Sequence, residues 1–256
     1  FFMFILKICG FLPVKLCNKA YLNFFLYLCI FLILAKFYIY KYSRIKGIKM
    51  NLEALRNYKF APIFQEYDFK DIILYGLGLG YGSNPTDANE LKFIFEDGLE
   101  ISPSFCNAIA HAGHWIMDEK LGLDWKNSLH GEQFFEIHKS MPLKGKVRAD
   151  YSIICVEDKG ENRGAIITAE KKLYDAINNV LCATLYQSIF FKNEGGNGGF
   201  GNAPNKAKPI PNSKPDLSLD IKTSNQLALI YRLSCDYEKI HASPKAANAM
   251  AKNNAV

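Results

Sequence analysis

The chain has 256 residues, of which 49% are hydrophobic, with a formal net charge of +6 and seven cysteines. This length can form one large domain or two modest ones around a buried core. Nucleic acid is excluded as a partner, because the basic residues gather before Met50 and no basic cluster follows them. The cysteines show neither paired spacing nor a zinc-like grouping with histidine, which favours reduced thiols inside a cell.

Residues 1–49 form an aromatic and aliphatic leader that differs in character from everything after Met50. Within it, the segment 21–40 has the length of a bilayer-crossing helix, about 20 residues, and a basic flank follows. Three interpretations stay open: a membrane anchor, an upstream stretch outside the translated protein, and a targeting segment. A membrane location follows only from the first of them.

The first element after the leader is a predicted helix. Asp68 is placed to cap it, and Ile72, Ile73 and Tyr75 form its apolar face. A glycine-rich turn over 76–85 is expected to end it. The glycines do not form a dinucleotide fingerprint, because that motif needs a preceding strand and a following helix.

The next segments change from helical to β character. The alternation over 91–95 predicts a strand, and the apolar run over 104–117 has the length of a helix. Four successive strands separated by turn signals are then predicted, at Gly131–Lys139, Lys146–Val156, Gly164–Tyr174 and Val180–Phe191. A long helix followed by an antiparallel sheet is an α+β arrangement in which the sheet wraps the helix.

A stretch rich in Gly, Asn, Pro and Lys over 193–215 has no apolar periodicity and is predicted to be a linker. A further helix is expected over 223–231, with Thr223 or Ser224 as its cap. Two histidines in the predicted helix, His111 and His114, are close enough to share a metal. Because no third ligand stands beside them, the sequence favours histidines that pack inside the protein.

The segment 74–80 can be laid on 230–236, which suggests an internal repeat. Both are an apolar helix end, then Tyr-x-Leu, then a turn of small residues. Gly80 in the first copy stands where the second copy has Asp236. The alignment predicts two related domains, the first of which lacks the acidic residue.

Asp236 and His241 are the strongest candidates for chemistry. They lie in a short irregular stretch between a helix end and the helix-starting pair Ser243-Pro244. A carboxylate and an imidazole presented from one loop can hold one water molecule, so that one group accepts its proton and the other steers or returns it. The alternative from spacing alone is a capping aspartate and a surface histidine.

The surrounding segment, Tyr-Arg-Leu-Ser-x-Asp-Tyr-x-x-Ile-His-Ala-x-Pro over 231–244, resembles the signature of the hydratase 2 (MaoC-like) family, Y-R-L-S-G-D-x-N-P-L-H-x-D-P. This family includes the enoyl-CoA hydratase part of the peroxisomal multifunctional β-oxidation enzyme and its bacterial counterparts. Further family motifs follow the same order along nearly all of 50–250, namely L-H-G-E-Q at 129–133, a Pro-Leu-x-Gly turn at 142–145, D-K-G at 158–160, the glycine-rich 196–201 and T-S-N-Q-L-A at 223–228.

The resemblance implies an α+β fold with tandem hot-dog domains, each an antiparallel sheet wrapped around a central helix. The first domain would accommodate the acyl chain without catalysing, and the second would perform the chemistry. The implied division is a leader at 1–49, a first domain at 50–192, a linker at 193–222 and a truncated second domain at 223–256.

The resemblance also implies an activity, the reversible hydration of a trans-2-enoyl-CoA to a (3R)-3-hydroxyacyl-CoA in fatty-acid β-oxidation, with no metal or redox cofactor. Asp236 and His241 would be catalytic. A lysine facing the CoA phosphates is sensible electrostatically. The residues expected to bind the substrate are His130, Gly131, Lys159, Tyr237, Glu238 and Ile240.

The active segment departs from the family signature at four positions. Glu238, in the place of Asn, adds a carboxylate two residues from Asp236. The other departures are Cys235 for Gly, Lys239 for Pro and Ser243 for Asp. The chain also stops at Val256, before the strands that follow in the family, so we expect a poor or inactive hydratase.

Two other classes of function stay open, a non-catalytic acyl-CoA-binding protein that uses the first domain alone and a membrane-anchored lipid-handling protein. A homodimer is a candidate assembly. The resemblance implies a location in the peroxisome or the cytoplasm, although the C-terminal Asn-Ala-Val is not a peroxisomal signal of the S-K-L type.

Overall fold

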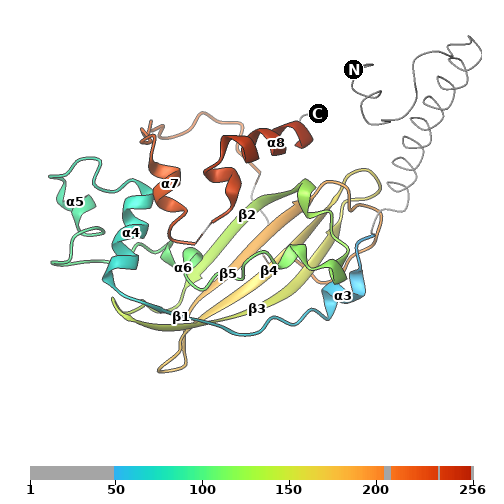
Figure 1. Ribbon diagram of the computed structural model, residues 1–256, viewed down its shortest axis with the longest axis horizontal. Coiled ribbons are helices and arrows are strands. Elements are labelled where there is room, and N and C mark those ends of the chain that lie inside the picture. The colour runs from blue at the N-terminus through green and yellow to red at the C-terminus, as the bar shows by residue number, and fades with distance from the viewer. Residues whose placement is uncertain (1–48, 205–208, 236, 255–256) are drawn as a thin grey trace, which may run out of the picture. The chain divides into compact units, whose positions relative to one another are not determined.

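The computed structural model describes residues 49–204, 209–235 and 237–254, so the predicted leader lies outside the described residues apart from Lys49. Its centre is a five-stranded antiparallel sheet in the order β1-β3-β4-β5-β2 (Figure 1). The strands are β1 (Ile63–Tyr67), β2 (Ser128–Ile137), β3 (Gly145–Asp158), β4 (Ala165–Asp175) and β5 (Val180–Phe191). No helix in the described part of the chain is long and apolar enough to cross a membrane.

The four predicted strands are confirmed as β2 to β5, joined by the turns that the sequence indicated. The fifth strand, β1, was missed, and it pairs with residues 145–149 of β3. Phe64, its second residue, is 56% exposed, because an edge strand with one face to solvent leaves every second side chain uncovered. Its short, mixed sequence carries too weak an alternation to be recognised on its own.

The first predicted helix is confirmed as α4 (Phe69–Leu79), following the short α3 (Leu52–Arg56). Asp68 caps it by accepting a hydrogen bond from the Lys70 N–H at 2.8 Å, and the Asp71 carboxylate accepts one from the Asp68 N–H at 2.9 Å. This reciprocal capping box satisfies two of the amide groups that a helix start leaves open.

The expectation that a glycine-rich turn from residue 76 ends this helix was wrong. α4 continues through Gly76 and Gly78 and ends at Gly80, which has a φ of 95°. A Cβ at Gly76 would lie 2.6 Å from the Phe93 carbonyl oxygen, and one at Gly78 would lie 2.8 Å from the Tyr231 Cα. These two glycines therefore serve close packing inside a helix, and only Gly80 serves the turn.

The predicted strand over 91–95 is also wrong, because residues 88–91 form the short helix α5 (Ala88–Leu91) and turns follow it. Asp87 caps this helix by accepting a hydrogen bond from the Asn89 N–H. Glu90 then accepts a hydrogen bond from the Gly82 N–H at 2.8 Å. These local side-chain contacts hold a compact loop where alternation alone indicated a strand.

The long helix predicted over 104–117 does not form. Only α6 (Phe105–Ala108) and the 3₁₀ turn η1 (Trp115–Met117) are helical. Ile109 has a ψ of 144°, and Ala110 has a φ of 52°. The Lys171 Nζ donates to the carbonyl oxygens of Cys106 and Ile109. A buried lysine thus supplies the hydrogen bonds that further helical turns would have made.

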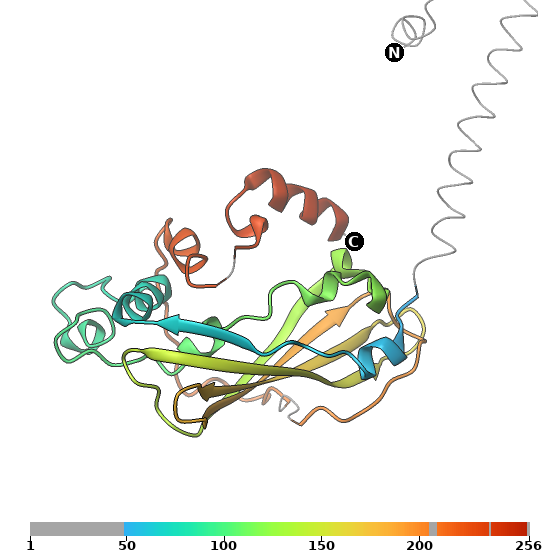
Figure 2. The same cartoon turned by 60° about the horizontal axis from the view of Figure 1, so that its bottom comes forward.

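Helices and 3₁₀ turns cover one face of the sheet, and together with it they form two clusters of buried apolar side chains. α4 and α6 cover one end through Tyr75 and Phe105, against the Val147 and Leu185 side chains. At the other end, α3, η1 and η2 (Glu119–Leu121) cover Ile167 and its neighbours. Figure 2 shows these segments lying along one side of the sheet. Burial of this kind supplies most of the stability of such a fold.

After β5 the chain contains no helix or strand in its described residues until α7 (Leu227–Tyr231). This helix is shorter than expected, and Gln226 precedes it without a side-chain cap, so the predicted cap at Thr223 or Ser224 is wrong. The 3₁₀ turn η4 (Lys239–His241) and the helix α8 (Pro244–Asn254) follow. The predicted helix start at Ser243-Pro244 is confirmed.

Candidate functional site

The segment 231–244 lies at the end of the described chain as α7, η4 and the start of α8. Asp236 lies outside the described residues. His241 is the last residue of η4 and is exposed, and its N–H donates to the Glu238 carbonyl oxygen at 3.2 Å. A single tight turn therefore holds His241 at the surface, where a substrate can reach it.

The three other predicted residues of this segment surround the turn. Tyr237 is 61% exposed, and its hydroxyl donates to the Leu233 carbonyl oxygen at 3.3 Å. Ile240 is half-buried within η4. The Glu238 carboxylate accepts a hydrogen bond from the Lys239 N–H at 3.0 Å. Glu238 thus contacts the beginning of the turn with its side chain and the end with its carbonyl group.

The part of this segment after α7 also contacts the residues that cover the sheet. The Nε2 of His114 lies 3.6 Å from the Glu238 Oε2, and α8 packs against η3 (Trp125–Asn127), the turn that leads into β2. The interpretation of His111 and His114 as packing histidines was wrong, because both are exposed and neither lies in a helix. Sequence alone gave no signal for the contact, because its partners are 124 positions apart, from 114 to 238.

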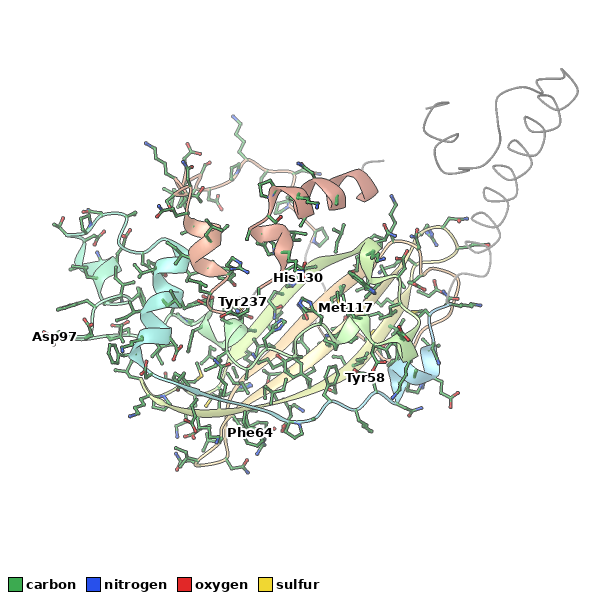
Figure 3. All side chains as sticks on the ribbon, viewed as in Figure 1. Tyr58, Phe64, Asp97, Met117, His130 and Tyr237 are labelled. Atoms are coloured by element: carbon green, nitrogen blue, oxygen red, sulfur yellow. The ribbon has the colours of Figure 1, made fainter. Side chains whose placement is uncertain are left out.

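His130 and Gly131 lie near the start of β2, at a β-bulge. The pairing with β5 shifts between His130 and Glu132, so that Gly131 opposes no residue of its own. A Cβ at Gly131 would lie 3.3 Å from the Ser188 carbonyl oxygen. The glycine of the L-H-G-E-Q motif therefore suits a bulge in which one strand presses close to the next. His130 is exposed beside it (Figure 3).

Lys159 lies in the turn between β3 and β4, where its Nζ contacts the Glu157 Oε2 at 2.8 Å. Asp158 beside it accepts hydrogen bonds from the N–H groups of Gly160, Gly196 and Gly198. The hydrogen bonds from Gly196, Gly160 and Gly198 hold the pKa of Asp158 below its ordinary value. The D-K-G turn and the glycine-rich loop are therefore one structure, joined through a single carboxylate.

The glycine-rich loop that was predicted to begin a linker is fixed to the sheet at its start. Val156 and Phe200 exchange backbone hydrogen bonds of 2.8 and 3.0 Å. A Cβ at Gly199 would lie 2.2 Å from the Val156 carbonyl oxygen. The glycines permit this close approach of backbone to backbone. Residues 194–201 therefore extend the sheet unit.

The predicted binding residues of the sheet share one end of it. The pairing places Ser128 opposite Phe191, Phe191 opposite Ala165 and Ala165 opposite Asp158. The starts of β2 and β4 and the end of β3 therefore lie in one row. Three strand spacings separate His130 from Lys159 across this row, about 15 Å. Such a distance suits contacts with different parts of one extended ligand.

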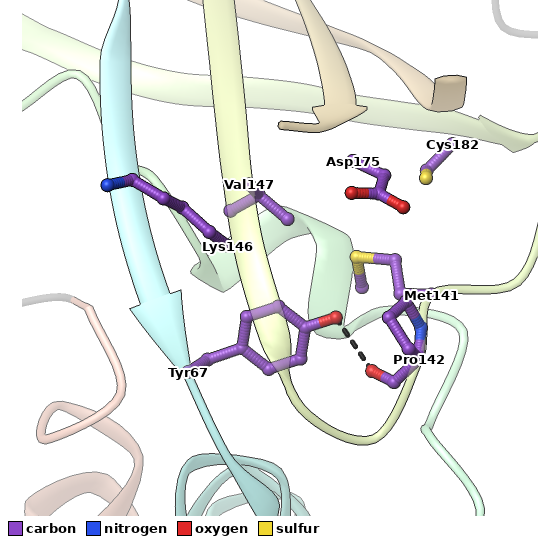
Figure 4. Close-up of a pocket in the computed structure, with 7 residues that line it drawn as sticks. All are labelled: Tyr67, Met141, Pro142, Lys146, Val147, Asp175 and Cys182. Atoms are coloured by element: carbon purple, nitrogen blue, oxygen red, sulfur yellow. Dashed lines mark hydrogen bonds between the residues drawn. The ribbon is translucent and has the colours of Figure 1, made fainter. Parts of the chain in front are cut away.

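Two adjoining hollows lie at the opposite end of the sheet. There the Tyr67 hydroxyl donates to the Pro142 carbonyl oxygen at 2.7 Å, above a space that leaves no room for water (Figure 4). An open hollow of about 280 Å³ adjoins it beside Lys139 and Asp175. Within the described residues, no group of three His, Cys, Asp or Glu side chains is arranged to hold a metal ion.

Lys171 is a buried functional group that the sequence reading missed. It lies on β4 beneath α6, and burial lowers its pKa to about 8. Burial also raises the pKa of the neighbouring Cys106 thiol to about 11. The available signal was its position in the strand, because alternation points residue 171 to the same face as the buried Ala169 and Leu173.

The two segments aligned as a repeat contact each other. α4 packs against α7, and the rings of Tyr75 and Tyr231, which the alignment makes equivalent, have centroids 5.9 Å apart. Gly78 lets the Tyr231 backbone approach the helix. Contact between equivalent residues is expected where two related units pack about an approximate twofold axis.

Comparison with known proteins agrees with this geometry. The family described as MFE-2 hydratase 2 N-terminal domain matches residues 65–193. The peroxisomal enoyl-CoA hydratase 2 of Arabidopsis thaliana is 28% identical over 218 residues, which cover 78% of this chain and 69% of that protein. The enoyl-CoA hydratase ChsH3 of Mycobacterium tuberculosis is 30% identical over 205 residues, which cover 78% of this chain and 70% of that protein.

A solved structure extends the comparison to the fold. The MaoC-like dehydratase of Phytophthora capsici superposes with a TM-score of 0.66 at 23% identity, covering 78% of this chain and 70% of that one. At this identity the likeness concerns the fold alone. The five-stranded antiparallel sheet with short helices on one face fits the hot-dog fold.

Proposed function

The chain belongs to the hydratase 2 (MaoC-like) family of hydro-lyases, and we propose from this membership that it hydrates trans-2-enoyl-CoA to (3R)-3-hydroxyacyl-CoA. One observation carries the proposal, which is that the segment 231–244 keeps both members of the acid/base pair, Asp236 and His241. The turn that bears His241 presents it to solvent beside the residues that cover the sheet.

The proposed reaction needs one water molecule and two proton transfers. Asp236 and His241 hold the water between them, and one of them accepts a proton as the water oxygen bonds to the β-carbon of the enoyl group. The α-carbon then takes up a proton returned from the pair. Hydrogen-bond donors at the thioester oxygen would stabilise the enolate that forms between the two steps.

We propose that the substrate extends along the end of the sheet that carries His130, Gly131 and Lys159. The register of the strands supports this, because these residues lie in one row about 15 Å wide. Lys159 would face the phosphates of the CoA moiety as a cation. Tyr237, Glu238 and Ile240 would contact the acyl thioester from the opposite side.

We further propose that the residues from Thr223 onward belong to a second unit related to the first, as in a tandem hot-dog arrangement. The contact between Tyr75 and Tyr231 supports this relation. The name of the plant relative supports a location in the peroxisome, with the cytoplasm as the alternative. A homodimer is the proposed assembly, by analogy with other hot-dog proteins.

The proposed activity is tested by steady-state hydration of crotonyl-CoA and decenoyl-CoA with the full chain, followed by chiral separation of the product. Asp236→Asn and His241→Ala should each lower kcat at least about 100-fold. His138→Gln, a histidine substitution at the other end of β2, should leave kcat unchanged. Activity that survives both site substitutions would rule out this acid/base pair.

Acyl-CoA binding without catalysis is the second candidate. The observation that favours it is that the five-stranded sheet, with His130, Gly131 and Lys159 on it, is complete within residues 63–191. Calorimetric titration of a saturated acyl-CoA into the full chain tests it. Binding that Lys159→Ala weakens, in a chain without hydratase activity, would favour this function over the first.

A further inference from the structure

Glu238 organises the turn that carries His241. Its carboxylate accepts a hydrogen bond from the Lys239 N–H at 3.0 Å, and its carbonyl oxygen accepts one from the His241 N–H at 3.2 Å. The N–H groups of Ala242 and Ser243 then donate to the Lys239 carbonyl oxygen at 3.1 and 2.8 Å. The orientation of this turn therefore depends on the position of Glu238.

His114 reaches the same carboxylate from the residues that cover the sheet. Its Nε2 lies 3.6 Å from the Glu238 Oε2, and the two side chains are 54% and 35% exposed. The pair joins a residue of the segment beyond residue 226 to a residue that covers the sheet. It gives the turn a lateral contact that the hydrogen bonds within the turn do not supply.

The backbone of His114 is itself fixed to the core. Its carbonyl oxygen accepts a hydrogen bond from the Met117 N–H at 3.0 Å, which closes η1. Trp115, the next residue, is buried, and its ring lies 5.7 Å from that of Phe60 and 6.3 Å from that of Tyr58. A ring anchored in an aromatic cluster thus holds the histidine in place.

The contact involves a position at which this chain departs from the family signature. Glu238 stands where the family signature has Asn, and an amide carries no charge that a histidine could pair with. The interaction needs both residues. The effect of changing His114 should therefore depend on whether Glu238 is present.

We propose that His114 is a positioning residue for the proposed hydratase site, acting through Glu238 on the turn that bears His241. The inference rests on the proposed function for its effect on catalysis. Its effect on the turn does not depend on that function. Because the pair is partly exposed, the expected effects are small, about threefold.

Two measurements on the full chain test the proposal, the kinetics of crotonyl-CoA hydration and hydrogen exchange of the peptide 237–243. His114→Gln should lower kcat about threefold with KM unchanged, and should speed exchange of this peptide about threefold. His114→Lys, which can pair with the same carboxylate, should restore both values. In a Glu238→Asn background, His114→Gln should change neither.

The matched control is His138→Gln, which removes a histidine that lies 4.0 Å from the Glu136 carboxylate on β2. It should leave exchange of 237–243 unchanged. Three results would overturn the proposal: unaltered exchange of 237–243 in His114→Gln, equal acceleration in the Glu238→Asn background, or faster exchange with unchanged kcat. A wild-type chain without hydratase activity defeats the proposed function alone, and the exchange measurements then still decide whether His114 positions the turn.

Discussion

The sheet unit, residues 63–201, and the helical segment, residues 227–254, are held by different physics. The sheet unit has strands of up to 14 residues and two clusters of buried apolar side chains. In the helical segment, neither α7 nor η4 contains a fully buried residue. The first is therefore stabilised by burial in its own core, and the second by partly buried contacts such as that of Tyr231 with Tyr75.

This difference separates the proposed binding residues from the proposed acid/base pair. The proposed contacts with the CoA moiety lie on the sheet unit, whereas the proposed acid/base pair belongs to the helical segment in the sequence. A few identifiable contacts should therefore control the reactive segment, with little effect on the sheet. Gly78, His114 and Glu238 make such contacts.

The largest expected effect is on the free energy of unfolding, and it tests whether burial decides the stability of the two regions. Phe191 is fully buried between β2 and β4, whereas Leu229 on α7 is 49% exposed. Phe191→Ala should lower the free energy of unfolding by about 3–5 kcal/mol, because it leaves a cavity in the core. Leu229→Ala should change it by less than about 0.5 kcal/mol. Urea unfolding followed by circular dichroism measures both, and equal losses would contradict the division.

A substitution at the contact between the two regions sharpens the comparison. A Cβ at Gly78 would lie 2.8 Å from the Tyr231 Cα and 3.2 Å from its nitrogen. Because backbone atoms cannot move aside cheaply, Gly78→Ala should destabilise the packing of α7 by about 1–3 kcal/mol. Hydrogen exchange should rise in 227–234 and stay constant in β4.

The control for this variant is Leu77→Ala, which changes an exposed side chain of the same helix. It should leave exchange of 227–234 at the wild-type value. Faster exchange in β4 as well would mean that α4, α7 and the sheet open together, and that the two regions are one cooperative unit.

The sheet was predictable from sequence because its strands carry a strong local signal. Residues of β4 alternate between buried and less buried positions over most of their length, and period-two alternation is a property of the strand itself. The same holds for Asp68, since a cap acts on the next few residues. These elements depend on neighbours in the sequence.

The failures arose where a distant residue decides the local structure. The helix expected over 104–117 ends early because Lys171, more than 60 positions away, bonds its carbonyl groups. Gly76 and Gly78 stay helical because Phe93 and Tyr231 pack against them. For the site, the motif identified the residues around His241, but the contact of His114 with that turn depends on the tertiary fold.

Lys171, which is buried in the sheet unit, allows a test through the pH dependence of the free energy of unfolding. Its pKa is lowered from 10.5 unfolded to about 8 folded, so between these values the unfolded chain binds more protons. The stability that Lys171 contributes should therefore rise with pH, by about 1 kcal/mol from pH 7 to pH 9. Lys171→Met removes this dependence.

The difference between wild type and Lys171→Met isolates the lysine from other groups. Burial raises the pKa of Cys106, whose ordinary value is 9.0, to about 11. Its stabilising contribution is lost only as the pH rises from about 9 to about 11, and because Lys171 itself lowers this pKa, the two proteins are compared at pH 9 and below. Urea unfolding at pH 7, 8 and 9 measures the difference, and a difference that stays constant would show that Lys171 is not held in a strongly desolvated site.

The smallest effect is expected at Asp158, whose carboxylate joins the glycine-rich loop to the turn after β3. Asp158→Asn keeps an oxygen for the Gly160 and Gly196 N–H groups, but its amide nitrogen would face the Gly198 N–H, which now donates to the second carboxylate oxygen. Exchange of 195–201 should therefore rise at neutral pH, while that of β5 stays constant.

The pH dependence of exchange in 195–201 shows whether the charge of the Asp158 carboxylate, or only the packing of the loop, holds residues 195–201. Because its folded pKa lies below the ordinary 3.8, the contribution of the carboxylate is complete above that value and is lost as the pH falls through the folded pKa. Wild-type exchange of 195–201, corrected for its intrinsic rate, should approach that of Asp158→Asn only in acid. If the two already agree at pH 7, the charge of Asp158 does not hold the loop. Its backbone hydrogen bonds between Phe200 and Val156 and its close packing then suffice.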